Sequence, residues 1–448
     1  MEDLEKREQA YSVCGECNEP GTGWYWCRSC NAKRFMENFK NWTSGNRDID
    51  ELIQYSQLNA VCFTNCFEWI PFENFQNVTY ITRGGFGKIY SAYWPEGCIL
   101  YWDIENQKWF RDPNIRVVLK NLDNSTNINK DFLNEIKSYL ETYPFNNITQ
   151  YYGITQNPST KDFIIVSQYC KDGNLRNYYL NKPTQLYFSK IGDLARIANG
   201  ILDIHNIGKI HKGLHSGNIL FDNKSFISDL GIYQPLNRNG NQSAEKEIYG
   251  VLPYIAPEVL REHQYTKAAD IYSFGIIMNE YFSEEIPFHD IPHDYDLAVK
   301  ICKGLRPKIS EDIPKLVANL IIQCWDAKAE NRPTAKDLYQ ILNEWFNDSI
   351  YNDISEIHFQ INESEKIREK KLKNRLKENN PRIIHIHPQA IYISRLLNFK
   401  DLPEPVNLDV STFQYSDDIL DCLDCQINVL GKIFYLDSLN IINFIIFN

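Results

Sequence analysis

The stretch of sequence that decides the fold reads His211-Lys212-Gly213-Leu214-His215-Ser216-Gly217-Asn218-Ile219-Leu220 and, after residues 221–226, Ile227-Ser228-Asp229-Leu230-Gly231. Two isolated polar residues, Asn218 and Asp229, stand among apolar neighbours on either side of an interval typical of a hairpin. Such an arrangement can bring an amide oxygen and a carboxylate to one metal ion that is held against phosphate groups. The pattern therefore indicates a site for a hard cation and a phosphate-bearing ligand.

The same stretch resembles two motifs of the eukaryotic protein kinases, the catalytic loop H-R-D-L-x-x-x-N and the metal-binding D-F-G. The resemblance implies that Asn218 and Asp229 bind Mg²⁺. It also marks a departure, because Gly213 stands where the family carries its catalytic aspartate, with His215 as a possible substitute base. An isolated Asp-Leu-Gly is a common turn, so the kinase interpretation depends on partner motifs that lie in the right order on both sides.

On the N-terminal side, Tyr80–Tyr90 resembles the glycine-rich loop that kinases place between two strands. Gly84, Gly85 and Gly87 would let backbone N–H groups approach phosphate oxygens without a Cβ in the way. Thr82 stands at the position of the family's first glycine. Similar glycines also make ordinary hairpins, so this motif is weak by itself.

A buried strand, Val117–Lys120, ends in a single charge. Lys120 resembles the kinase lysine that binds the α- and β-phosphates of ATP, and Glu135 resembles its helical partner. An unpaired buried lysine is unfavourable, so the two residues support each other. Val118 replaces a smaller alanine of the family and is expected to add bulk to the adenine pocket.

The segment Phe163–Cys170 is typical of the strand and hinge that join the two lobes of a kinase. The resemblance implies that backbone groups of Gln168 and Cys170 bind adenine, with Ile89 above the base and Leu220 beneath it. Isoleucine and leucine are also ordinary core residues, so these last two positions depend on the family pattern.

Beyond the metal-binding motif, Gly250–Glu258 resembles the end of a kinase activation segment. The resemblance implies an ion pair between Glu258 and Arg332, and it implies that Asp270 holds the backbone of the catalytic loop. These are structural residues, and they imply an intact large lobe.

Together the motifs predict an α+β protein with the two-lobed protein kinase fold over about residues 75–347. The β-rich small lobe is expected at 75–167 and the helical large lobe at 171–347. Tyr151–Thr155 and the block that ends at Glu258 resemble the tyrosine-kinase-like branch. They are most similar to the kinase-like proteins that are expanded in arbuscular mycorrhizal fungi.

Four cysteines near the N-terminus have the spacing C-x₂-C-x₉-C-x₂-C, at Cys14, Cys17, Cys27 and Cys30. Each pair can place two thiolates on one tetrahedral ion, and the nearby aromatic residues would form a core too small to fold without metal. We therefore expect a structural Zn²⁺ site in a module at residues 10–48. The alternative is two unrelated pairs in an unstructured tail, and the interval between the pairs is shorter than in common zinc ribbons.

Two further segments do not belong to the kinase pattern. Residues 94–116 are rich in aromatic residues and predict an extended hairpin on the small lobe, whose rings favour packing over ligand binding. Residues 348–448 are expected to form a charged helical linker and a C-terminal tail. The lysine-rich run at 356–379 could be a nuclear-import or acidic-partner surface, but a solvated linker helix is favoured.

The 448-residue chain has a formal net charge of −11 and a pI near 5.4. No overall basic field therefore argues for a nucleic acid partner. The charged first residues do not resemble a secretory signal peptide, and no run is long and apolar enough to span a membrane. We expect a cytoplasmic protein, in which the uneven cysteine spacing does not favour disulfides.

Three functions are compatible with these observations. The favoured one is a kinase-fold protein that binds ATP and Mg²⁺ but transfers phosphate weakly or not at all, acting in intracellular signalling. The second is a working Ser/Thr or Tyr kinase, in which positioning or His215 supports catalysis. The third is a non-enzymatic adaptor whose cysteine module recruits protein partners. Nucleotide binding separates the third function from the others, and turnover separates the first two.

Overall fold

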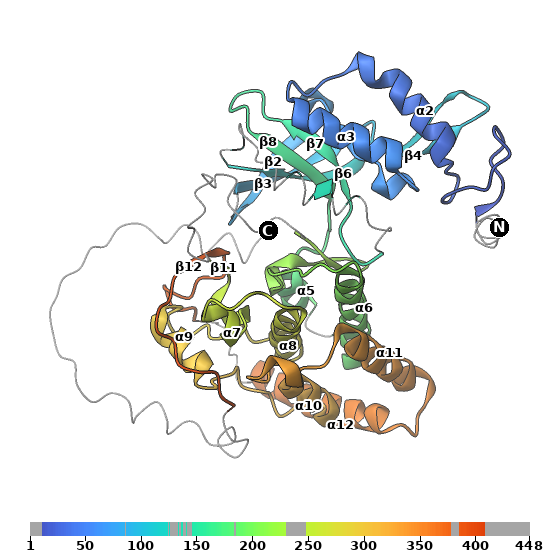
Figure 1. Cartoon of the computed structure of the whole chain (residues 1–448). Coiled ribbons are helices and arrows are strands. Elements are labelled where there is room, and N and C mark those ends of the chain that lie inside the picture. Colours follow the sequence, from blue (N-terminus) through green and yellow to red (C-terminus); the bar gives the residue numbers. More distant parts are fainter. Residues whose placement is uncertain are drawn as a thin grey trace. The chain divides into compact units, whose positions relative to one another are not determined.

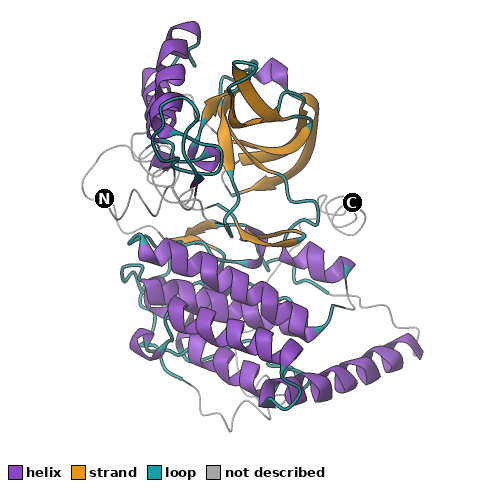
Figure 2. Ribbon diagram, turned by 90° about the vertical axis from the view of Figure 1, so that its right-hand side faces the viewer, coloured by secondary structure: helices purple, strands orange, loops and turns teal. Residues whose placement is uncertain are grey.

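The structure is a computed structural model that describes residues 11–85, 87–123, 125, 133, 136–137, 140, 146–182, 185–229, 248–377 and 385–407. Figure 2 shows one region built mainly of strands and a second built mainly of helices. They correspond to the strand-rich small lobe and the helical large lobe that the sequence predicts, so the two-lobed α+β architecture is confirmed.

The small lobe is built on a six-stranded sheet in which only β1 and β7 run parallel to each other. Successive side chains of β8 point to opposite faces, so Phe163 and Ile165 pack in one apolar cluster while Ile164 and Val166 pack in another. The sheet order is β1 (Glu68–Trp69), β7 (Tyr151–Gln156), β8 (Phe163–Gln168), β6 (Ile115–Asn121), β3 (Gly87–Trp94) and β2 (Gln76–Gly84).

Between β3 and β6 the chain forms the predicted hairpin, from the antiparallel strands β4 (Cys98–Asp103) and β5 (Lys108–Asp112). The ring of Trp109 stacks on Phe35 with a centroid distance of 4.7 Å and on Trp26 with 5.8 Å. Phe35 belongs to α2 (Arg28–Asn38), which is followed by α3 (Arg47–Asn59). The aromatic residues of the hairpin thus pack the N-terminal module against the small lobe.

The large lobe surrounds α8 (Lys267–Ser283), which is buried along almost its whole length, as expected for a helix that is apolar on all sides. Helices α6 (Tyr187–Asn206) and α11 (Ala335–Tyr351) pack together beside it. The remaining elements are α5 (Leu175–Asn181), β9 (Ile219–Asp222), β10 (Lys224–Ile227), α7 (Pro257–Leu260), α9 (Tyr295–Cys302) and α10 (Lys315–Cys324). Short 3₁₀ turns lie at Phe39–Asn41, Phe63–Asn65, Phe72–Asn74, Ser216–Asn218, Leu252–Tyr254 and Ala329–Asn331.

The charged run after the large lobe forms α12 (Glu356–Lys377), but the expectation of a solvated linker is wrong for its first turns. Ile357 and Ile361 are buried in the core of the large lobe. Arg368, also buried, pairs with Glu284 at 2.7 Å. In this helix a few apolar residues stand among many charged ones and form no continuous apolar face. The sequence alone therefore suggested a helix exposed to solvent.

The chain then returns to the large lobe, where β12 (Arg395–Leu397) pairs with β11 (Ile248–Gly250), as the adjacent labels in Figure 1 show. This pairing joins the C-terminal segment to the described end of the activation segment.

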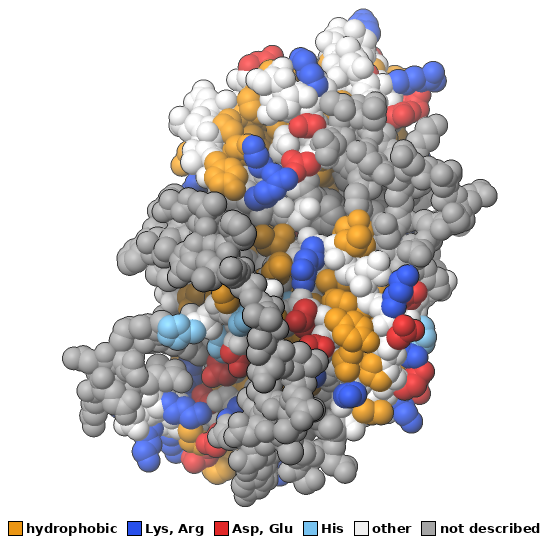
Figure 3. All heavy atoms as spheres, turned by 90° about the vertical axis from the view of Figure 1, so that its left-hand side faces the viewer, with side chains coloured by type: hydrophobic (Ala, Val, Ile, Leu, Met, Phe, Trp, Pro, Cys, Tyr) orange, Lys and Arg blue, Asp and Glu red, His pale blue; other side chains and the backbone are white. Residues whose placement is uncertain are grey.

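No helix in the described ranges has the length and apolar character needed to cross a membrane. On the face shown in Figure 3, positive and negative side chains are intermixed.

Candidate functional site

The catalytic loop is held from below by Asp270 of α8, which is 1% exposed. Its carboxylate accepts hydrogen bonds from the backbone N–H groups of His211 (2.7 Å) and Lys212 (2.9 Å). His205 Nε2 lies 2.9 Å from the same carboxylate. Lys212 has a φ of 67°, an uncommon conformation for a lysine, which these bonds maintain. The prediction that Asp270 fixes this loop is confirmed.

His211 connects the catalytic loop to the metal-binding motif. Its Nδ1 accepts the Gly213 N–H at 3.3 Å, and its Nε2 lies 3.1 Å from the Ser228 carbonyl oxygen. These partners place the ring proton on Nε2. Burial lowers the pKa of His211, so the ring stays neutral. The histidine therefore fixes Gly213 close to the residue that precedes Asp229.

Gly213 is buried at the centre of this loop. Its carbonyl oxygen accepts a hydrogen bond from Asn218 Nδ2 at 2.9 Å. Because the amide nitrogen is used in this way, the Asn218 oxygen is the atom that would face a cation. Gly213 is not among the described glycines that adopt a positive φ, so its backbone conformation suits an ordinary side chain.

Lys120 and Asp229 form an ion pair across the two lobes, with side chains that are 14% and 27% exposed. Asp229 has a φ of 62°, in the left-handed region that aspartate tolerates better than most residues. Glu135, the expected partner of Lys120, lies outside the described residues, so that pairing stays a prediction. The neighbouring helical residues Leu133 and Ile136 are described and buried.

The glycine-rich loop is the tight turn between β2 and β3, where Gly84 pairs with Gly87. A Cβ on Gly87 would lie 1.8 Å from the carbonyl oxygen of Asn121. A Cβ on Gly85 would lie 2.6 Å from the carbonyl oxygen of Ser394. Glycine is therefore required at both positions by close backbone approach.

Strand pairing brings the expected adenine-binding residues of the small lobe together. Ile89 of β3 lies opposite Lys120 of β6. Val118 of β6 lies opposite Ser167 of β8, the residue that precedes Gln168. Leu220 of the large lobe is partly exposed. Cys170 is buried, and burial raises the pKa of its thiol to about 12, so this cysteine is a neutral side chain. Their contact with a base stays a prediction.

His215 lies beside the catalytic loop in a form poorly suited to accept a proton. Its Nδ1 accepts the Gly217 N–H at 3.1 Å, which leaves the ring proton on Nε2. Burial, together with the nearby charge of Arg176, lowers the pKa of His215 to about 3. The free nitrogen of the neutral ring is thus already used as a local acceptor.

The sequence analysis missed a buried polar network beneath the same loop. Arg176 Nε donates to Glu280 at 2.7 Å, and Arg176 Nη2 donates to the Tyr254 hydroxyl at 2.9 Å. The Tyr254 hydroxyl lies 3.0 Å from Ser216 Oγ. The signal for this network in the sequence was Glu280, a carboxylate that stands between the apolar residues 276–278 and 281–282 of the same helix.

The predicted ion pair of the large lobe is confirmed. Arg332 Nη1 and Nη2 donate to the two carboxylate oxygens of Glu258 at 2.7 and 2.8 Å. The Arg332 side chain has no exposed surface, so the pair ties the end of the activation segment to the core.

The four N-terminal cysteines converge, with sulfur atoms that all lie within 4.8 Å of one another. Cys14 and Cys30 are 3.9 Å apart at Sγ, and Cys17 and Cys27 are 3.6 Å apart. Four sulfurs at about 2.3 Å from one tetrahedral ion would be roughly 3.8 Å apart. The cluster could therefore hold a metal ion, and its geometry fits zinc.

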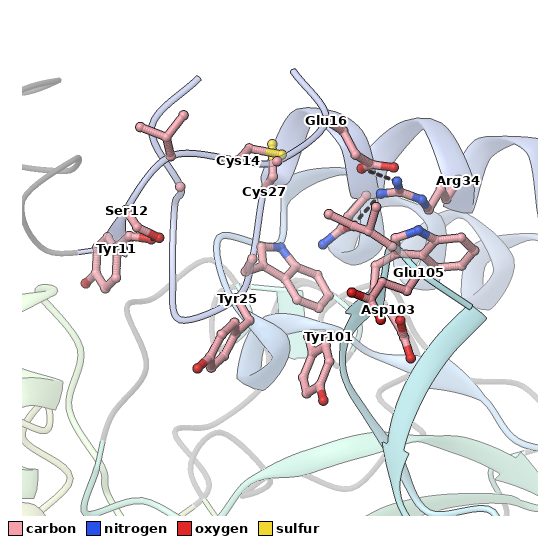
Figure 4. Close-up of a pocket in the computed structure, with 17 residues that line it drawn as sticks. Tyr11, Ser12, Cys14, Glu16, Tyr25, Cys27, Arg34, Tyr101, Asp103 and Glu105 are labelled. Carbon is pink, nitrogen blue, oxygen red and sulfur yellow. Dashed lines mark hydrogen bonds and ion pairs between the residues drawn. The ribbon is translucent and has the colours of Figure 1, made fainter. Parts of the chain in front are cut away.

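A cavity of about 250 Å³ lies between this cysteine cluster and the β4–β5 hairpin (Figure 4). Arg34 stacks on Trp102, 4.3 Å from its ring centroid, and pairs with Glu16. Within the described part of the chain, the side-chain N–H groups of Asn31 and Trp102 that line this cavity are buried without an acceptor.

Comparison with known proteins identifies the family. The family model of protein tyrosine and serine/threonine kinases matches residues 75–342, more than half of the chain. The chain belongs to this family.

Proteins similar to this chain include kinases from two organisms. A probable LIM domain-containing serine/threonine-protein kinase of Dictyostelium discoideum is 32% identical over 203 residues, which cover 44% of this chain and 30% of the relative. The serine/threonine-protein kinase VIK of Arabidopsis thaliana is 27% identical over 282 residues, which cover 60% of each chain. The chain therefore spans less than two thirds of the length of these relatives.

Proposed function

We propose that this chain binds ATP with Mg²⁺ as a pseudokinase whose phosphotransfer is weak or absent, and that it acts as a signalling component. One observation carries the proposal: Gly213 replaces the catalytic aspartate in a loop whose supporting bonds are otherwise present. Asp270, His211 and Asn218 all hold this loop in place. What the loop lacks is therefore one carboxylate side chain, the one that would accept the proton of the attacking hydroxyl.

The nucleotide-binding role is supported by the charges that face each other between the lobes. Lys120 lies against Asp229. Asn218, in the 3₁₀ turn just before β9, donates its amide nitrogen to Gly213, so its amide oxygen is the atom that would face a cation. Lys120 would bind phosphate oxygens, while Asn218 and Asp229 would hold Mg²⁺. A bound magnesium ion would neutralise phosphate charge, and these two residues would hold it.

The loss of activity can be estimated from the missing base. A positioned general base contributes roughly 10²–10⁴-fold to a rate. A kinase that would otherwise turn over at about 1–100 s⁻¹ would then retain on the order of 10⁻⁴–1 s⁻¹. Glycine offers no acceptor for the proton of an attacking hydroxyl, so positioning and metal alone would support the remaining rate.

Rescue by His215 is disfavoured by its hydrogen bond and its charge state. The nitrogen that could accept a proton already accepts the Gly217 N–H. A pKa of about 3 makes the ring a weak base near neutral pH. The working-kinase alternative therefore requires this ring to leave its present position.

The test is a phosphotransfer assay on three full-length proteins: the natural chain, Gly213→Asp and His215→Asn. We expect a near-inactive natural chain, a gain of about 10²-fold or more in Gly213→Asp, and no further loss in His215→Asn. Asparagine keeps an acceptor for the Gly217 N–H but cannot act as a base. This variant therefore tests the histidine as a base without removing the hydrogen bond that shapes the loop. Robust natural activity that disappears in His215→Asn would show that the histidine is the base, and absence of nucleotide binding would favour the adaptor function.

We also propose that the four-cysteine cluster holds a structural Zn²⁺. The sulfur separations support a tetrahedral site, and four thiolate ligands leave no position for a substrate. The adjoining stack of Trp26, Phe35 and Trp109 supports a role in fixing the module on the small lobe.

We propose that any phosphotransfer by this chain acts on a hydroxyl side chain of a protein. The similar proteins named above are serine/threonine kinases, which supports a protein with a hydroxyl side chain as the partner of any residual activity. A panel of Ser, Thr and Tyr peptides tested with Gly213→Asp would identify the preferred acceptor.

A further inference from the structure

The segment 385–407 lies across the large lobe and reaches the catalytic cleft. Its strand β12 pairs in antiparallel register with β11, with Arg395 opposite Gly250 and Leu397 opposite Ile248. Just before this strand, the Ser394 carbonyl oxygen approaches Gly85 of the glycine-rich loop so closely that a Cβ there would lie 2.6 Å away. One short stretch therefore contacts both the activation segment and the glycine-rich loop.

Inward-facing side chains fix this stretch to the large lobe. Tyr392 donates a hydrogen bond to the Pro287 carbonyl oxygen at 2.7 Å, and its ring packs edge-on against His293 with a centroid distance of 4.8 Å. Arg395 donates to the His293 carbonyl oxygen. Leu397 is 3% exposed and joins the main apolar core.

The alternate side chains face outward. Ile393 is 52% exposed and Leu396 is 45% exposed. The stretch thus has the pattern of an extended peptide added to a strand edge, in which main-chain pairing gives affinity and alternate side chains fill specific positions. The inward residues read Tyr392-x-x-Arg395-x-Leu397.

Tyr392 links residues 385–407 to the catalytic loop indirectly, by way of Arg176 and Tyr254. The Arg176 guanidinium carbon lies 4.1 Å from the centroid of the Tyr392 ring. Arg176 also bonds Tyr254, whose hydroxyl lies 3.0 Å from Ser216 of the catalytic loop. Removal of the tyrosine would therefore uncover the outer face of the network that supports this loop.

We propose that residues 385–407 are a strap that occupies, in cis, a docking site for an extended peptide formed by the β11 edge, Arg176 and His293. A partner peptide with an aromatic residue, a basic residue three positions later and a leucine two positions after that competes for the site. While the strap is seated, it blocks the approach of a protein between the glycine-rich loop and the activation segment. Docking at this site requires no phosphotransfer.

Tethering explains why the natural chain would hold its own segment. A segment on the same chain competes at an effective concentration of millimolar order, so a free peptide at micromolar concentration cannot displace it. Loss of two side-chain hydrogen bonds and a packed ring should weaken the strap by about 10–100-fold. The site would then accept a peptide in trans.

The test uses a fluorescent peptide with the sequence of residues 389–401 and three full-length proteins. In the first variant Tyr392→Ala and Arg395→Ala remove the two polar side-chain anchors of residues 392–397, while the ion pair of Glu404 with Arg261 is left intact. In the matched control Ile393→Ala and Leu396→Ala change the two outward residues of the same stretch. Fluorescence anisotropy should show peptide binding about 10–100-fold tighter to the anchor variant than to the natural chain or the control. A peptide with the tyrosine and leucine both changed to alanine should not bind.

Hydrogen exchange on the natural chain provides a measurement that does not depend on a variant. The amides of residues 395–397 should exchange faster than those of α8, because a displaceable strap opens locally. Equal exchange in β12 and α8 would make the segment a permanent part of the core and overturn the proposal. Equal peptide affinity for all three proteins would overturn it as well.

Discussion

The catalytic loop and the N-terminal cysteine module are held in place by opposite means. The loop depends on buried charges from distant parts of the chain. Asp270 bonds its backbone, and Arg176 reaches Ser216 of the loop through the Tyr254 hydroxyl. The module depends on four thiols that lie close in the sequence and on a stack of three aromatic rings. The large lobe thus keeps its supporting bonds although Gly213 stands at the position of the catalytic aspartate, whereas the module, as proposed above, would depend on one metal ion.

The largest expected effect comes from removing the metal. Structural zinc sites contribute about 10–16 kcal/mol of apparent free energy in small zinc-finger peptides, so the module should lose its fold when zinc is chelated or when Cys27→Ser removes a ligand. Metal analysis should find one zinc per natural chain, and the thiols should become reactive in the variant. Cys62→Ser is the matched control, because this buried cysteine lies outside the cluster and should leave the zinc content unchanged. If the natural chain contains no zinc, the module is not stabilised by a metal ion, and the contrast with the catalytic loop fails.

The next effect tests the charges that hold the large lobe. Glu258→Ala leaves the guanidinium of Arg332 buried without its carboxylate, which should lower the free energy of unfolding by about 3–5 kcal/mol. Urea denaturation measures the change. Glu369→Ala is the control, since its pair with Lys373 is exposed on both sides and should contribute less than about 1 kcal/mol. Similar losses of unfolding free energy in both variants would mean that the buried Glu258–Arg332 pair stabilises the protein no more than an exposed pair does.

Nucleotide binding should show a smaller free-energy change. Lys120→Ala removes a charged phosphate contact and should weaken Mg²⁺–ATP binding by roughly 10–100-fold. Asp229→Ala should remove the dependence of binding on Mg²⁺. Calorimetric titration with and without Mg²⁺ measures both effects, with the exposed Lys108→Ala as the control. No binding to the natural chain at millimolar ATP would mean that the bulk of Val118 closes the pocket.

The smallest effect concerns pH and the catalytic loop. His215 has a pKa of about 3 when folded against about 6.5 when unfolded, so only the unfolded chain gains its proton as the pH falls from 7 to 5. Stability should therefore decrease over this range, by about 1–2 kcal/mol from this residue.

The check is the denaturation midpoint of the natural chain and of His215→Asn at pH 7 and pH 5. The variant should lose less stability between the two values, because asparagine does not titrate. Equal losses would show that the histidine is solvated in the folded protein, which would reopen its role as a base.

The motifs of the site could be read from the sequence because each is local or follows a strict family order. The roles of Asp270, Glu258 and Arg332 were predicted correctly in this way. The hairpin at 94–116 was also predicted, because alternating aromatic residues around a polar turn indicate paired strands. The place where its aromatic rings pack could not be predicted, since Trp109 meets Phe35 and Trp26 only in the folded chain.

The sequence by itself determined the kinase fold, the glycine at the position of the catalytic base and the spacing of the four cysteines. Only the tertiary structure decided that His215 accepts a local N–H, that Lys120 pairs with Asp229, and that residues 385–407 return to the cleft. The physical reason is the range of the interactions. Residue type and spacing specify turns, strands and ligand sets, whereas protonation, burial and long-range pairing depend on neighbours that are distant along the chain.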